Sequence, residues 1–185
     1  LAGHASLITH DGFRSLIVAT PVFDEWLATP SLDRWRTLVD TWTTLGSPLT
    51  RPSLPGVRTA PVSFTHYNDD NQIWRRGFVL RALHDAPGHD VASLTASARW
   101  YAPGRWTDAG DPAEMVTEIL QEASLLGLVR DGALAPLASA VLFGDDDAID
   151  EAAAAVFPAA VSSFTVQADL TALARGDAFD PVIGR

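Results

Sequence analysis

Apolar positions three and four residues apart predict that most of this chain is helical. Between Pro112 and Leu126 the spacing begins directly after Asp111, which can cap a helix, and ends at Gly127, which can take the left-handed conformation that closes one. Pro112 suits the first helical position because its missing N–H is not needed there, and Glu114 is placed to complete a capping box. The pattern therefore predicts a helix with both ends specified.

A β-hairpin is predicted immediately after this helix. Asp131-Gly132 separates two short apolar segments, and a two-residue type I′ turn needs positive φ at both central residues, which Asp and Gly tolerate. Two earlier helices are predicted over 72–86 and 91–100. Since three helices followed by a hairpin is the order of a winged helix, we expect a winged-helix domain over 72–144.

A second hairpin is predicted near the N-terminus, where apolar residues flank Asp11-Gly12. The tripeptide Ala5-Ser6-Leu7 before it matches Ala123-Ser124-Leu125 near the end of the capped helix. This repetition indicates two winged-helix units in tandem, with the upstream helices of the first unit lying before the first residue.

Two helices containing tryptophan are predicted next. Pro21 begins a short one in which Phe23, Trp26 and Leu27 are expected to face inward, and Ser31 begins a longer one. The longer helix carries an apolar stripe of Trp35, Leu38, Val39, Trp42 and Leu45. Such a stripe can be an aromatic platform for bases or part of a core, and we favour the core because the side chains share one face.

Proline and glycine recur through residues 46–71 without the period of a helix or a strand, which indicates a linker or long loop. We expect residues 1–45 to hold the end of a first winged-helix unit and the Trp-rich helices. Residues 145–185 are expected to hold a helix and a strand, over 163–169, that start a C-terminal unit. The predicted fold class is mainly α with small β-hairpins (α+β), with winged-helix units, two in tandem.

The charge balance opposes general affinity for nucleic acid. The net charge is −10 and the isoelectric point is about 4.7, so any phosphate contact needs a local basic patch. The candidates for such a patch are all arginines: Arg75, Arg76, Arg81, Arg99 and Arg105. A solvated helix face is the other interpretation of these residues, and it is the one that we favour. The helix over 112–126 instead presents carboxylates, which would repel DNA and could bind a basic protein partner: Glu114, Glu118 and Glu122.

No residue pattern names a reaction. The five histidines form no metal-spaced pair on one helix face, the glycines form no phosphate-binding loop, and there is no cysteine. We therefore expect no catalytic residue, no metal and no cofactor, and a protein that is not an enzyme. No segment has the length and apolarity of a membrane span, and without cysteine or an export signal we expect a cytoplasmic protein.

Three short segments carry a resemblance to a known family: Asp24-Glu25-Trp26-Leu27, the helix end Glu122–Gly127 and the strand-like Val166–Thr171. With the surrounding residues they resemble actinobacterial helicase-associated proteins of the XPB N-terminal-domain type. The resemblance implies a non-catalytic module with winged-helix units that binds DNA or a helicase partner in DNA unwinding or repair. It implies no catalytic residues, because the ATPase motor motifs of such helicases are absent from this sequence. The alternative from another class is an acidic protein-interaction scaffold or regulatory domain that does not contact nucleic acid.

The C-terminal segments 169–175 and 180–185 are also similar to the start of the first ATPase domain of Clp-type unfoldases. The preceding chain holds the Trp helices and a predicted wing in place of the repeated helical N-domain of Clp proteins. We therefore interpret the Clp similarity as coincidental.

Overall fold

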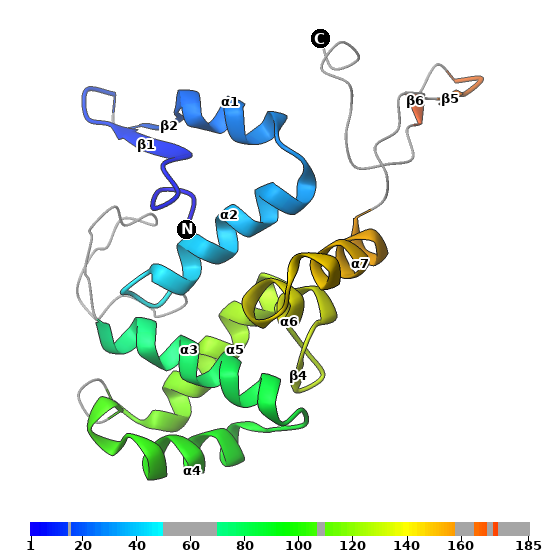
Figure 1. The fold of residues 1–185 in the computed structure, drawn as a ribbon. Coiled ribbons are helices and arrows are strands. Elements are labelled where there is room, and N and C mark those ends of the chain that lie inside the picture. The colour runs from blue at the N-terminus through cyan, green and yellow to red at the C-terminus, as the bar shows by residue number, and fades with distance from the viewer. Residues whose placement is uncertain (15, 50–69, 107–109, 158–164, 170–171, 174–185) are drawn as a thin grey trace.

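The computed structural model describes residues 1–14, 16–49, 70–106, 110–157, 165–169 and 172–173. Within these residues it is mainly helical with short antiparallel hairpins (Figure 1), so the mainly α, α+β fold class is confirmed. The helices are α1 (Pro21–Ala28), α2 (Ser31–Thr44), α3 (Asp70–Asp85), α4 (Val91–Tyr101), the 3₁₀ turn η1 (Pro103–Arg105), α5 (Pro112–Leu125), α6 (Pro136–Phe143) and α7 (Asp146–Val156). The paired strands are β1 (Ile8–Asp11) with β2 (Leu16–Ala19), β3 (Val129–Arg130) with β4 (Ala133–Leu134), and β5 (Thr165–Val166) with β6 (Ala172–Leu173).

Helix α5 begins and ends where the sequence predicts. The Asp111 carboxylate accepts a hydrogen bond from the backbone N–H of Ala113 at 3.0 Å, and Pro112 occupies the first turn. Glu114 does not form the expected capping box with Asp111. A capping box is found instead at the start of α4, where Asp90 and Ser93 exchange hydrogen bonds.

The exit from α5 is a Schellman motif. The N–H of Leu128 donates to the carbonyl of Ala123 at 2.8 Å, and the N–H of Gly127 donates to the carbonyl of Ser124 at 3.0 Å. Gly127 has a φ of 71°, the left-handed conformation predicted for it. The chain is thereby turned directly into β3.

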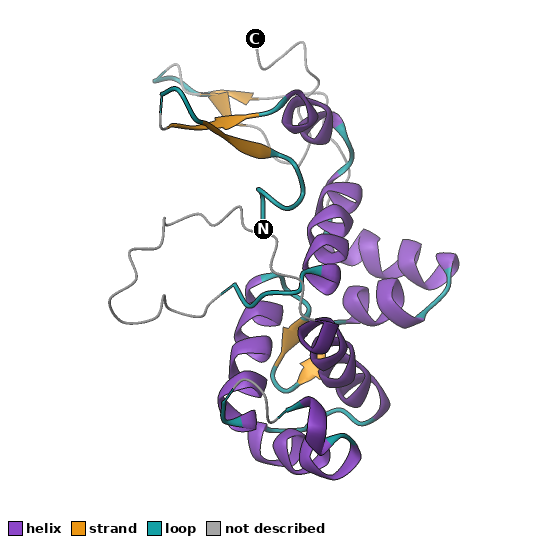
Figure 2. Cartoon of the chain, turned by 90° about the vertical axis from the view of Figure 1, so that its left-hand side faces the viewer, coloured by secondary structure: helices purple, strands orange, loops and turns teal. Residues whose placement is uncertain are grey.

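The β3–β4 hairpin has the predicted two-residue turn. Asp131 and Gly132 have φ values of 52° and 73°, and Arg130 lies opposite Ala133. The N–H of Gly88, in the loop between α3 and α4, donates to the carbonyl of Gly132 at 3.0 Å. This bond holds the hairpin among the helices, where Figure 2 shows it.

The β1–β2 hairpin is confirmed, but its turn is longer than predicted. Asp11 pairs with Leu16, so more than two residues separate the strands. The Asp11 carboxylate accepts hydrogen bonds from the backbone N–H groups of Phe13 and Arg14, at 3.0 and 3.3 Å. Asp11 therefore stabilises the loop as an acceptor and does not occupy a central turn position.

The N-terminal residues close a turn in the same way as the end of α5. The N–H of Leu7 donates to the carbonyl of Ala2 at 2.9 Å, and that of Ser6 to Gly3 at 3.2 Å. Ser6 has a φ of 59°, so it takes the left-handed conformation that Gly127 takes after α5.

The segments that follow these two turns also correspond. Thr20 donates its N–H to the carbonyl of Leu7 at 3.0 Å, as Ala135 does to Leu128 at 2.9 Å, and a proline-initiated helix follows each, α1 or α6. Leu7 and Leu128 are both buried. Leu7 therefore corresponds to Leu128, and the sequence comparison, which matched Leu7 to Leu125, was wrong by three residues.

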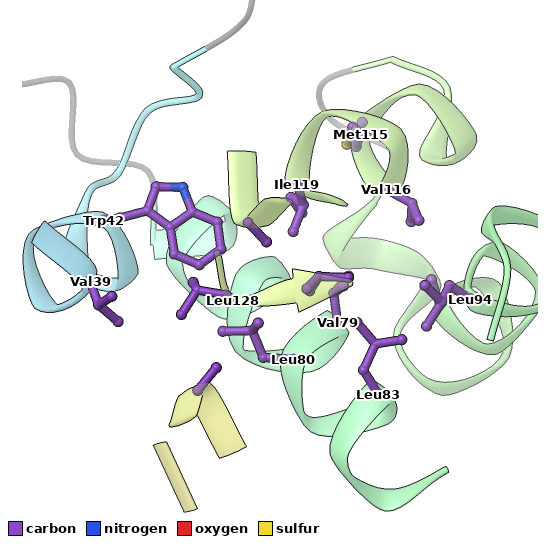
Figure 3. Close-up of a cluster of buried hydrophobic side chains, with 14 of the residues drawn as sticks. Val39, Trp42, Val79, Leu80, Leu83, Leu94, Met115, Val116, Ile119 and Leu128 are labelled. Carbon is purple, nitrogen blue, oxygen red and sulfur yellow. The ribbon is translucent and has the colours of Figure 1, made fainter. Parts of the chain in front are cut away.

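One hydrophobic core joins α2 to α3, α4 and α5 (Figure 3). The labelled core side chains are Val39, Trp42, Val79, Leu80, Leu83, Leu94, Met115, Val116, Ile119 and Leu128. The α2 stripe is core in part: Val39, Trp42 and Leu45 are buried, whereas Trp35 and Leu38 are half-buried. On α1 the prediction was wrong for Leu27, which is 47% exposed.

Residues 50–69 of the predicted linker lie outside the described residues, as do residues 158–164, 170–171 and 174–185 of the predicted C-terminal unit, whereas its predicted helix is α7. Of the strand predicted over 163–169, residues 165–169 are described, and only Thr165 and Val166 form a strand, β5. Among the described helices, none combines the length and apolarity needed to cross a bilayer. The division of the chain into domains remains a prediction, although α2 shares its core with α3–α5.

Candidate functional site

Two of the five arginines proposed for nucleic-acid contact lie in the interior. Arg75 is 1% exposed and Arg76 is 0% exposed. A guanidinium must reach solvent to neutralise a phosphate, so both residues are withdrawn as contacts, and the solvated-face interpretation is wrong for them as well. The reason is that α3 packs this face against α2, α5 and η1.

Arg76 forms a buried ion pair with Glu122. Arg76 Nη2 lies 2.9 Å from Glu122 Oε2, and both side chains have 0% exposure. The indole N–H of Trp42 donates to the same carboxylate oxygen at 2.7 Å, and the N–H of Leu49 donates to the other oxygen. Glu122 is therefore an internal acceptor that connects α2, α3 and α5, and it is withdrawn as a partner-binding residue.

The Arg76 guanidinium also holds the chain that leaves α2. It donates to the carbonyls of Trp42 at 2.9 Å, Ser47 at 2.7 Å and Leu45. Burial lowers the pKa of Arg76 from its ordinary value, and Glu122 opposes this shift. Arg76 nevertheless stays charged, because an arginine does not deprotonate in proteins. The buried charge is tolerated because these oxygen acceptors surround it.

Arg75 has a comparable internal role at the other side of α3. Its Nε donates to the carbonyl of Arg105 at 2.6 Å, and its guanidinium lies over the Trp106 ring at 5.8 Å. These contacts connect α3 to η1, so Arg75 positions the segment that follows α4.

The other three arginines are exposed, and they do not share one patch. Arg81 lies over the ring of Phe143 of α6, at 4.1 Å from its centroid. Arg105 lies in η1, and Arg99 lies at the end of α4, next in the sequence to two exposed aromatic side chains. These are Trp100, 81% exposed, and Tyr101, 75% exposed.

Both cations beside these aromatics already have neighbours. Arg99 lies 3.5 Å from the Asp111 carboxylate, and Arg105 donates to Asn71 at 3.2 Å while lying 5.1 Å from the Trp74 ring. Surface contacts of this kind are weak and exchange readily for other partners. The end of α4 therefore exposes two aromatic rings and the Arg99 guanidinium, while the exposed Arg105 contacts α3.

The outward face of α5 combines carboxylates with an apolar groove. Glu114 is exposed and Glu118 is half-buried on this face. The groove has a volume of about 560 Å³ and is lined by Val91, Thr117, Leu120, Gln121, Ser124 and Leu125. Leu125, the last residue of α5, is 82% exposed at this groove.

Sequence reasoning missed the apolar part of this face. Leu125 follows Glu114, Glu118 and Gln121 at spacings that return to the same side of a helix. A helical projection that placed these polar residues outward would have placed Leu125 outward with them. The signal was therefore present in the spacing.

Among the residues that the structure describes, no three His, Asp or Glu side chains converge on a point where a metal ion could bind. Comparison with protein-family models, with curated proteins and with solved structures finds no match to this chain. The functional argument therefore depends on the surfaces described above.

Proposed function

We propose that this chain is a non-catalytic, helicase-associated module built on a winged-helix unit, and that it binds a protein partner. The order α3, α4, α5, β3, β4 supports a winged helix, as does the two-residue turn between β3 and β4. The matching hydrogen bonds around Leu7 and Leu128 support a second, related unit in tandem. The helicase association itself rests on the family resemblance, and the lack of cysteine fits a cytoplasmic setting.

The observation that carries the choice of a protein partner is the chemistry of α5. In a DNA-reading winged helix the third helix enters the major groove, where cationic and amide side chains meet bases and phosphates. Here α5 exposes Glu114 and Leu125, while the neighbouring Arg75 and Arg76 are internal. A surface of this kind would repel phosphates and suits a protein surface.

Single-stranded nucleic acid is the second candidate ligand, and it would bind elsewhere on the chain. The exposed rings of Trp100 and Tyr101 could stack on bases, with Arg99 and Arg105 beside them for phosphates. The nearby Asp111 carboxylate and the net charge of −10 weaken this candidate.

Two binding measurements on the whole chain test the proposal. The immobilised chain is titrated with the motor protein of an actinobacterial XPB-type helicase, followed by biolayer interferometry. Labelled single- and double-stranded DNA is titrated separately at low and moderate salt, followed by fluorescence anisotropy. We expect saturable motor binding and no salt-sensitive DNA signal.

A variant separates the two candidates. In Arg99→Ala with Arg105→Ala, motor binding should be unchanged. A salt-sensitive DNA signal without motor binding would overturn the protein-partner proposal, and its loss in the double variant would locate nucleic acid at the end of α4.

A further inference from the structure

We infer that the groove along α5 binds a basic amphipathic helix of the partner protein. This inference rests on the proposed function and specifies which segment of a partner the surface would accept. The groove lies between the outward face of α5 and the first turn of α4, where Val91 forms part of its wall. It is open to solvent.

The apolar contribution comes from three side chains. Leu120 and Val91 are half-buried at the base of the groove, and Leu125 stands at its edge with 82% of its surface exposed. Leu125 therefore contributes little to the core, and its apolar surface is available to a ligand. Apolar side chains at helical spacing on a partner would pack between these three residues, as in other helix-in-groove complexes.

The charge around the groove selects a cationic partner. The sequence contains no basic residue between Arg105 and Arg130, so α5 carries only carboxylates as charged groups. Hydrogen bonds from the backbone and side chain of Ser93 lower the pKa of Asp90, which therefore stays ionised beside Val91 at neutral pH.

The arginines that border this region are already next to carboxylates. Arg99 lies 3.5 Å from Asp111 at one end of α5, and Arg130 lies 3.5 Å from Asp131 beyond the other. Arginine or lysine side chains flanking the apolar stripe of the partner would meet Glu114 and Asp90. An acidic helix or a nucleic acid would meet repulsion at the same positions.

The dimensions fit a helix of moderate length. The part of α5 that lines the groove, from Thr117 to Leu125, runs for about 12 Å, which is just over two helical turns. A partner helix of that length presents apolar residues at two or three successive turns, enough to contact Leu120, Leu125 and Val91.

The experiment uses the intact chain and two synthetic helical peptides about four turns long. Both carry leucines along one face, and they differ only in that one has arginines and the other glutamates beside the leucines. Binding is measured by fluorescence anisotropy of labelled peptide at low and moderate salt. We expect the basic peptide to bind, with lower affinity at the higher salt, and the acidic peptide to bind at least about tenfold more weakly.

Two variants locate the binding. Leu125→Asp should weaken the basic peptide about tenfold or more, because it removes the apolar anchor. The variant also adds a negative charge. If the peptide bound only through non-specific charge attraction, this variant would bind it more tightly, not more weakly. Leu27→Asp, at an exposed leucine of α1, is the matched control and should leave the affinity unchanged.

The inference is overturned if the two peptides bind equally, if neither binds, or if Leu125→Asp leaves the basic peptide unaffected. These outcomes are separate from those for the proposed function. Motor binding that persists in Leu125→Asp would retain the interaction module and exclude the groove. Absence of motor binding by the unaltered chain would count against the module itself, whatever the peptides do.

Discussion

Arg76 and Glu122 are charged side chains with no exposed surface, and each supplies a partner that the other needs. Removing water from a charge costs several kcal/mol, and a buried pair is tolerated only where further hydrogen bonds complete it. Here Trp42, Leu49 and the backbone carbonyls of Leu45 and Ser47 after α2 supply those bonds. The pair therefore fixes where α2 lies against α3 and α5.

Removing one member of this pair should be strongly destabilising. Glu122→Ala leaves the Arg76 charge buried without its carboxylate, so we expect the free energy of unfolding to fall by about 3–5 kcal/mol in urea denaturation. Arg130→Ala is the control, because its side chain is 87% exposed, and it should change stability by less than about 0.5 kcal/mol.

A double substitution distinguishes the charge from the packing. Arg76→Met with Glu122→Leu removes both charges, so it should cost less than Glu122→Ala alone. If the double variant is less stable than Glu122→Ala, the loss of stability comes mainly from the broken hydrogen-bond network and not from the unpaired charge.

The turns that end α5 and form the β3–β4 hairpin depend on glycines with positive φ. Gly132 has a φ of 73°, and an added Cβ would lie 3.3 Å from the carbonyl oxygen of His89. Gly132→Ala should therefore destabilise the chain by about 1–2 kcal/mol in urea denaturation. Gly127→Ala, with a φ of 71° and open space around it, should cost less.

Gly77→Ala is a control that should change the free energy of unfolding in the opposite direction. Gly77 lies inside α3 with no atom within 4 Å of an added Cβ, so Gly77→Ala should stabilise the chain by about 0.5–1 kcal/mol. Equal effects at Gly77 and Gly132 would show that backbone conformation is not what these turns require.

The cap of α4 predicts a dependence on pH. Hydrogen bonds from Ser93 lower the pKa of Asp90 in the folded chain below the ordinary carboxyl value of about 3.9. Stabilisation by the ionised cap is complete above that ordinary value and is lost as the pH falls through the folded-state pKa. Asp90→Asn should thus be less stable than the unaltered chain at neutral pH, and the difference should disappear in acid. A difference that stays constant with pH would contradict this assignment.

The elements that could be predicted from the sequence are those whose conformation depends on neighbouring residues. The positive φ of Gly127 and of Asp131-Gly132 follows from the residues themselves. The burial of Arg76 could not be predicted in this way, because Trp42 and Glu122 lie 34 and 46 residues away along the chain. A pair of adjacent arginines on a helix is indistinguishable in sequence from a basic surface, and the candidate site was misplaced for that reason.

At the scale of the whole molecule, α2 and the helices α3–α5 should unfold as one cooperative unit because they share one core. Val39 and Trp42 of α2 are 0% exposed among core side chains of α3 and α5. We therefore expect tryptophan fluorescence and far-ultraviolet circular dichroism to report the same unfolding midpoint in urea for these helices.

Trp42 is the side chain on which this coupling depends most. Trp42→Ala opens a cavity in the shared core and removes the indole donor to Glu122. The free energy of unfolding should therefore fall by about 3–5 kcal/mol for the whole transition. Trp100→Ala, which alters an 81% exposed ring, should leave the midpoint unchanged. If Trp42→Ala instead splits the transition in two, α2 unfolds separately, and the chain is better described as two units held together by the Arg76–Glu122 contacts than as one. The α5 groove would then belong to the unit formed by α3, α4 and α5 alone.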